Sequence, residues 1–139
     1  MVFEGACHCG AIRASFETAR RPEDIQVRAC QCSFCRRRGG LTVSDPDGRL
    51  VFRAAKDRLH RYRFGTATAD FLLCRDCGGY LGVVQEIEGR LYGVLNVRGA
   101  DIRELAERAP EPMDYEAETT MGRMTRRQAK WSPAVLEEV

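Results

Sequence analysis

The chain has 139 residues, 44% of them hydrophobic and 30% charged, and its 22 basic and 20 acidic side chains leave a formal net charge of +2. This length suits a single domain spanning residues 1–139, and the composition excludes a disordered or fibrous protein. The balanced charge makes nucleic acid an improbable partner, and no apolar run approaches the ~18 residues of a membrane span.

Two short strands are predicted near the N-terminus. Residues 11–17 (AIRASFE) and 24–29 (DIQVRA) alternate apolar and polar side chains, which is the period of a half-buried strand. The Arg20-Arg21-Pro22 segment predicts a turn between them. After Cys35, the two glycines of Arg36-Arg37-Arg38-Gly39-Gly40 are expected to end a short helical turn that carries cysteines.

The middle of the chain is predicted to be an antiparallel β assembly. Residues 45–48 (DPDG) favour a turn, because proline presets φ, aspartate bonds to nearby amides and glycine tolerates positive φ. We therefore expect a hairpin between residues 41–44 and 49–53. Four more strand candidates follow, and the last two are joined at Glu88-Gly89; they are residues 59–64, 69–73, 80–85 and 91–97.

Two helices are predicted in the C-terminal third. Residues 100–109 (ADIRELAERA) change to a helical period, with Asp101 suited to the helix start and Pro110 ending the element. Residues 119–130 predict a second, basic helix, anchored to the body by Trp131 and Pro133.

Seven cysteines without a secretion signal indicate metal ligation in the cytoplasm rather than a disulfide framework. Cys74 and Cys77 form a CxxC that follows a strand and ends in two glycines, which is typical of a zinc knuckle. A redox pair is the alternative, but it requires a helix after the motif, where a strand is predicted.

A closed zinc site needs four ligands, and Cys7 and Cys9 can complete it. In a CxC both side chains fall on the same face of an extended segment, so both sulfurs can reach one ion while His8 points away. We therefore expect His8 to lie at the surface or behind the ligands and not to bind the ion, because four sulfurs already saturate a tetrahedral zinc.

Cys30, Cys32 and Cys35 form a compact CxCxxC with no fourth protein ligand. Three ligands and an exchangeable position are typical of a catalytic zinc. An iron–sulfur cluster is the chemical rival, but it normally takes four thiolates.

Arg36, Arg37 and Arg38 follow this open site directly. They can form a solvated charged face, or they can lower thiolate pKa values and bind the carboxylates of an acidic substrate. Ser44, Asp45 and Asp47 are candidates for proton transfer, although turn chemistry explains them equally well.

Three linked motifs closely resemble the glutathione-dependent formaldehyde-activating enzyme (GFA) family; they are residues 5–12 (GACHCGAI), 30–36 (CQCSFCR) and 74–78 (CRDCG). The resemblance implies a mainly β, zinc-bound β-tent of several short curved antiparallel sheets with one or two short helices. It also implies a structural zinc on Cys7, Cys9, Cys74 and Cys77 and a labile, catalytic zinc on Cys30, Cys32 and Cys35. The reaction it implies joins glutathione to formaldehyde, and in reverse is that of a carbon–sulfur lyase.

Two functions follow for testing. In the first, a three-cysteine zinc binds a glutathione-like thiol and adds it to formaldehyde or another small aldehyde, with Arg36–Arg38 attracting the carboxylates of the thiol. In the second, the chain is a non-catalytic zinc module that binds a protein or nucleic acid through the Arg run and the basic C-terminal helix.

Overall fold

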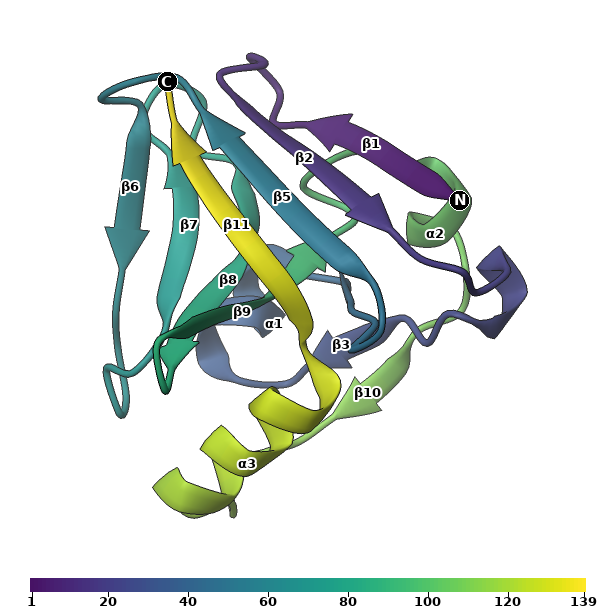
Figure 1. The fold of residues 1–139 in the computed structure, drawn as a ribbon, viewed down its shortest axis with the longest axis vertical. Coiled ribbons are helices and arrows are strands. Elements are labelled where there is room, and N and C mark those ends of the chain that lie inside the picture. Colours follow the sequence, from purple (N-terminus) through teal and green to yellow (C-terminus); the bar gives the residue numbers. More distant parts are fainter.

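The computed structural model describes residues 1–139 and is mainly β, as the sequence predicts (Figure 1). The strands are β1 (Val2–Ala6), β2 (Ile12–Glu17), β3 (Arg28–Cys30), β4 (Thr42–Val43), β5 (Arg49–Ala54), β6 (Leu59–Tyr62), β7 (Asp70–Cys74), β8 (Tyr80–Ile87), β9 (Arg90–Asn96), β10 (Glu111–Met113) and β11 (Ser132–Glu138). The helices are the 3-10 turn η1 (Pro22–Asp24), α1 (Ser33–Arg38), α2 (Arg103–Ala106) and α3 (Thr120–Lys130). None of these helices has the length and apolar character needed to cross a bilayer.

All strands belong to one curved sheet with two arms. β1, β2, β5 and β11 form one arm, and β11 continues into the second arm by pairing with β9. β9 pairs with β8 and β4, so that β6–β7–β8 extend from one edge and β4–β3–β10 from the other. Most pairings are antiparallel, as expected, but β11 runs parallel to β5 and β10 runs parallel to β3. The sheet is therefore mixed.

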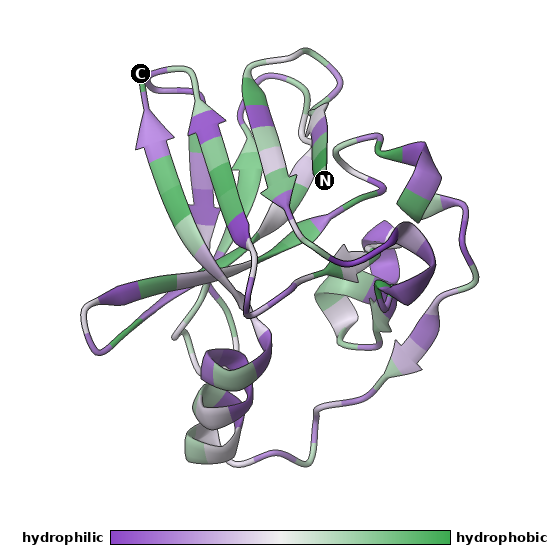
Figure 2. Ribbon diagram, turned by 45° about the vertical axis from the view of Figure 1, so that its right-hand side comes forward, coloured by the Kyte–Doolittle hydropathy of each residue, from purple (hydrophilic) through white to green (hydrophobic).

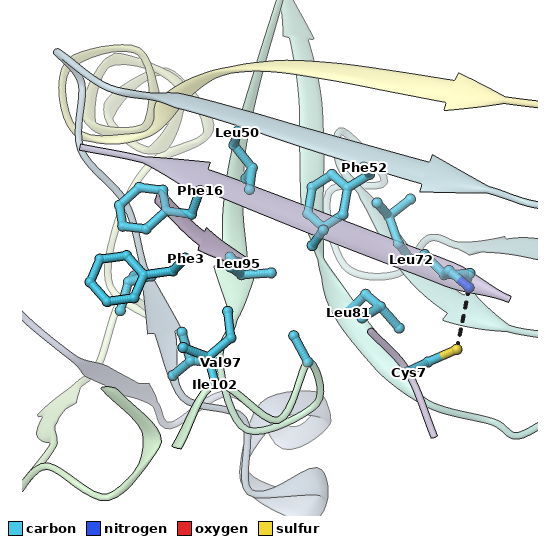
Figure 3. Packing of buried hydrophobic residues seen from close by; sticks show 14 of the residues in the cluster. Phe3, Cys7, Phe16, Leu50, Phe52, Leu72, Leu81, Leu95, Val97 and Ile102 are labelled. Atoms are coloured by element: carbon cyan, nitrogen blue, oxygen red, sulfur yellow. Dashed lines mark hydrogen bonds between the residues drawn. The ribbon is translucent and has the colours of Figure 1, made fainter. Parts of the chain in front are cut away.

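The main core fills the space between the two arms (Figure 3). Along β2 and β5 the buried side chains alternate with exposed ones, so one face of this arm is apolar. In Figure 2 these strands show the same alternation of hydrophobic and hydrophilic residues. Phe16 and Phe52 are fully buried and pack toward Leu72, Leu81 and Leu95 of the second arm.

β8 is covered on both faces, and this gives the molecule a second core. Leu81 and Val84 belong to the main core, whereas Tyr80 and Val83 face the opposite side with Phe34 of α1 and Trp131. The second core therefore attaches α1 and the end of α3 to the sheet. The cysteines at residues 30–35 lie at its border.

Several predicted elements are confirmed. The β8–β9 hairpin turns at Glu88 and Gly89, which both have positive φ (53° and 77°), as a two-residue type I′ turn requires. The C-terminal helix is α3, where the Thr119 side chain accepts a hydrogen bond from the Gly122 amide. Trp131 is buried directly after it.

The predicted hairpin of residues 41–44 and 49–53 is wrong. The turn forms, since the Gly48 amide donates to the Asp45 carbonyl at 2.9 Å, but the flanking strands diverge. β4 pairs with β3 and β9, whereas β5 pairs with β2 and β11. Asp45 separates them because it is buried and is fixed by Thr18 and Ser132.

Two other boundaries also differ from the sequence prediction. The strand expected at residues 24–29 begins only at Arg28, because Pro22 starts the 3-10 turn η1 and the chain straightens after it. The helix expected at residues 100–109 shrinks to α2, since Asp101 adopts a left-handed conformation (φ 54°) and cannot cap it. β1, β10 and β11 were not predicted from the sequence.

Candidate metal centres and active site

The first cysteine cluster, called the four-cysteine cluster, contains Cys7, Cys9, Cys74 and Cys77. Their sulfurs all lie within 4.8 Å of one another, with Cys7 Sγ 3.8 Å from Cys9 Sγ and Cys9 Sγ 3.5 Å from Cys74 Sγ. A tetrahedral ion with zinc–sulfur bonds of about 2.3 Å separates its ligands by about 3.8 Å. These four residues therefore fit one tetrahedral metal ion, and His8 lies outside the cluster on the surface.

Tight backbone turns bring the four sulfurs together. The Ile12 amide donates to Cys7 Sγ at 3.3 Å, and Gly78 (φ 75°) donates its amide to the Cys74 carbonyl. A Cβ at Gly79 would lie 3.1 Å from Cys7 Cβ, which is closer than an ordinary contact, so glycine lets the two halves of the cluster approach without displacing Cys7. The Cys9 backbone amide lowers the pKa of Cys77 to about 6, which favours the thiolate that a metal requires.

The second cluster, called the three-cysteine cluster, contains Cys30, Cys32 and Cys35, whose sulfurs also lie within 4.8 Å of one another. Cys30 ends β3, and Cys32 is the N-cap of α1, where its sulfur accepts the Cys35 amide at 3.4 Å. Short helical geometry therefore turns three nearby residues toward one point, and Gly39 (φ 62°) then ends the helix.

The electrostatics of the three-cysteine cluster favour a cation. Hydrogen bonding from the Cys30 thiol, and then from Cys35 and the amides of α1, lowers the pKa of Cys32 to about 2. The same neighbours, first Cys30 and then Cys32, together with burial, raise the pKa of Cys35 far above its usual range. Three negative charges this close repel one another, so all three thiols ionise together only around a positive ion.

Tyr80 supports the cluster from the sheet side. Its hydroxyl oxygen lies 3.8 Å from Cys35 Sγ, and its ring packs edge-on against Phe34, with centroids 5.0 Å apart. Burial raises the pKa of Tyr80 well above its usual value, so the hydroxyl stays neutral and can donate to a thiolate. Tyr80 therefore helps to orient Cys35.

A cavity of about 440 Å³ opens directly onto the three-cysteine cluster. Cys30 and Cys32 line it, and Phe64 and Phe71 form an aromatic wall. The residues of the four-cysteine cluster do not line this cavity. The two clusters thus differ in the number of their cysteines and in their surroundings, since only the three-cysteine cluster opens onto this cavity.

The structure distributes the predicted arginine run over different environments. Arg36 lines the cavity, Arg37 is exposed, and the Arg38 guanidinium lies 4.0 Å from the centre of the Phe34 ring. Ser44, Asp45 and Asp47, the candidates for proton transfer, do not line the cavity. Asp45 instead accepts hydrogen bonds from Thr18 and from the Asp47 amide, so its role in the structure is that of a turn residue.

The basic end of the cavity is formed by α3. From the sequence, the basic residues of this helix were expected only as the contact surface of a non-catalytic zinc module. Arg123, Arg126 and Arg127 of α3 line the cavity, together with Tyr115 from the loop before α3. The spacing of these arginines in the sequence could have shown that they lie together, because residues 123, 126 and 127 share one face of a helix. The position of that face over the cysteines depends on β11 returning to the sheet.

The protein is mainly β and carries two groups of cysteines whose spacing fits a metal ion, and the three-cysteine cluster faces a cavity. Residues 2–116 match the family described as glutathione-dependent formaldehyde-activating enzyme, and the chain belongs to this family. A crystal structure of a Rhodobacter sphaeroides protein is similar, with 33% sequence identity and a TM-score of 0.57. The similarity covers 78% of this chain and 97% of that one. The family match ends before α3.

Proposed function

We propose that the protein is a carbon–sulfur lyase that reversibly adds a glutathione-like thiol to formaldehyde or another small aldehyde. The observation that carries this proposal is the opening of the three-cysteine cluster onto the cavity, within a chain of the GFA family. We place the enzyme in the cytoplasm, where thiols are kept reduced.

The metal in both clusters is, in this proposal, zinc. Thiolate sets of three and four sulfurs suit this ion, and an iron–sulfur cluster at residues 30–35 would lack its fourth thiolate. The four-cysteine cluster has a structural role and the three-cysteine cluster a catalytic one. A bound zinc supplies the catalytic site with a Lewis acid that lowers the pKa of an incoming thiol.

The reaction itself needs little from the protein beyond binding and orientation. The sulfur of the thiolate attacks the carbonyl carbon, a carbon–sulfur bond forms, and the carbonyl π electrons move to oxygen. This oxygen takes up a proton in place of the one lost by the thiol, which gives an S-hydroxymethyl product without any redox change. Holding both reactants in one cavity removes much of the entropic cost of joining them.

The rival function, a zinc module that binds nucleic acid, finds less support in the geometry. It requires the basic residues of α3 to form an exposed surface that contacts phosphates. Arg127 is instead buried and Arg123 and Arg126 are half-buried, and all three line the cavity. This arrangement favours a small ligand over a macromolecular one.

Exchange NMR tests the proposed reaction. Glutathione and ¹³C-formaldehyde are mixed with the zinc-loaded protein, and the exchange rate between free and S-hydroxymethyl forms is compared with that in buffer. Acceleration by the parent protein and none by Cys32→Ser supports the proposal. Equal rates with and without the parent protein would reject this substrate pair.

A further inference from the structure

Three arginines line the inner end of the cavity, and two of them are buried without a carboxylate partner. The inner pocket, defined here as the recess of about 60 Å³ behind the main cavity, is lined by Arg28, Arg126 and Arg127 as well as Cys30 and Cys35. Arg28 and Arg127 each expose only 9% of their surface. Neither makes a salt bridge, although eleven ion pairs occur elsewhere in the chain.

Arg127 has unused hydrogen-bonding capacity in this pocket. Its Nη1 donates to Gln85 Oε1 at 2.8 Å, and its guanidinium lies 4.8 Å from the centre of the Trp131 ring. Its Nε is buried and has no acceptor. A buried guanidinium with neutral partners and an unsatisfied N–H is costly, and such a group is an exception in folded proteins.

Arg126 and Arg28 line the same pocket as Arg127. The partner of Arg126, Glu118, is shared with Arg123, and the partner of Arg28, Ser44, is neutral. Glu118 accepts two hydrogen bonds from Arg126, at 2.8 and 3.0 Å, and the Tyr115 ring lies 3.6 Å from the Arg126 guanidinium carbon. Arg28 donates from Nη2 to Ser44 Oγ. Burial lowers the pKa of both Arg28 and Arg127, as expected for cations without a counter-charge.

Glu118 reaches the arginines of the inner pocket, but it is already shared between Arg126 and Arg123. Asp114 and Glu116 are exposed at the rim of the main cavity, and neither lines the inner pocket. The three arginines of the inner pocket exceed the negative charge of Glu118 together with that of a metal-bound three-thiolate centre, which carries a net charge of about −1. The missing counter-charge is therefore an anionic part of the ligand.

We propose that the inner pocket binds a carboxylate of the thiol substrate, with Arg127 as its main partner and Arg126 and Arg28 as supporting cations. The assignment rests on the proposed function, since the thiol group would lie at the three-cysteine cluster. It names the substrate class as thiols that carry a carboxylate. It also makes α3, outside the family match, a specificity-determining element.

A planar carboxylate suits this pocket because guanidinium groups bind it through paired hydrogen bonds. The pocket is small enough to hold such a group and little more. Its walls include Cys30, so a short carbon chain can connect the carboxylate in the pocket with a sulfur at the cysteines. Thiols that lack a carboxylate should bind less well.

The single tryptophan of the chain, Trp131, lines the inner pocket and reports on its occupancy. We would titrate the zinc-loaded protein with 3-mercaptopropionate, with its neutral amide 3-mercaptopropionamide, and with propionate, and record tryptophan fluorescence. The acid thiol is expected to bind at least about tenfold more tightly than the amide, as a charge-assisted hydrogen bond predicts. Propionate should perturb the fluorescence by itself.

Two variants sharpen the comparison. Arg127→Gln is expected to abolish the preference for the acid, whereas Arg90→Gln removes the same charge from the exposed β8–β9 turn and should retain it. If Arg127→Gln does not fold, the acid–amide comparison on the parent protein still decides the question.

The outcomes separate this inference from the proposed function. Equal binding of the acid and the amide would overturn the carboxylate pocket and leave thiol binding intact. Propionate that binds as tightly as 3-mercaptopropionate would support the pocket and contradict thiol binding at the cysteines, on which the proposed function depends. A preference for the acid that persists in Arg127→Gln would overturn the assignment of Arg127.

Discussion

The two cysteine clusters should differ in their contribution to stability, because their ions close loops of different length. The four-cysteine cluster joins Cys9 to Cys74, which are 65 residues apart, whereas the three-cysteine cluster closes only residues 30–35. Treated as cross-links, these loops correspond to about 4 and about 2 kcal/mol of unfolded-state entropy at 25 °C. With about 2.1 cal/mol/K of unfolding entropy per residue over 139 residues, this predicts losses of roughly 15 and 7 °C in Tm.

The comparison uses two double variants that replace the more exposed cysteines of each cluster. Cys9→Ser with Cys77→Ser removes the long cross-link, and Cys30→Ser with Cys32→Ser removes the short one. Thermal unfolding is followed by circular dichroism at one fixed zinc and protein concentration, since both shift Tm. A larger loss of Tm in the Cys30/Cys32 variant would show that loop length does not set the contribution of each cluster to stability. An unchanged Tm in the Cys9/Cys77 variant would show the same.

Three further predictions follow. Mild chelation should remove the metal of the three-cysteine cluster first, because this cluster has one ligand fewer and faces a cavity. Elemental analysis should then find one ion per chain, and loss of both ions together would contradict this. Gly99→Ala should destabilise the protein by about 2 kcal/mol or more in urea unfolding, since the alanine Cβ would lie 1.9 Å from the Tyr80 carbonyl oxygen. An unchanged midpoint of urea unfolding would argue against this contact. Arg127→Met should change the free energy of unfolding by only about 1 kcal/mol, because the substitution leaves no buried carboxylate unpaired. A loss near the ~3–5 kcal/mol of a broken buried ion pair would show that Arg127 has an unrecognised partner.

Each cysteine motif could be predicted because its information is local, whereas joining Cys7 and Cys9 to Cys74 and Cys77 rested on the four ligands that a closed zinc site needs. In a CxC, a CxxC or a CxCxxC the spacing alone brings the sulfurs within reach of one ion, and the structure groups the seven residues as the sequence suggests. The β8–β9 hairpin is equally local, since Glu88-Gly89 fixes the turn and the register.

The elements that the sequence did not reveal depend on distant partners. β11 pairs in parallel with β5, more than eighty residues earlier, and β10 has only three residues beside β3. The prediction of a hairpin around residues 45–48 was wrong because it also depended on distant partners. The tertiary contacts of Asp45 direct the two flanking strands to different neighbours. The role of Arg127 could not be read from its helix alone, since burial by β8 and Trp131 decides it.

Cobalt substitution tests most directly whether a thiol reaches the metal of the three-cysteine cluster. The labile site is emptied by mild chelation and reloaded with Co²⁺, whose visible absorption depends on its ligands, and glutathione is then added. We expect a saturable change in the cobalt spectrum of the parent protein, with no such change in Cys32→Ser. A parent spectrum that stays constant at saturating glutathione would show that this cluster is not an open, thiol-binding metal centre.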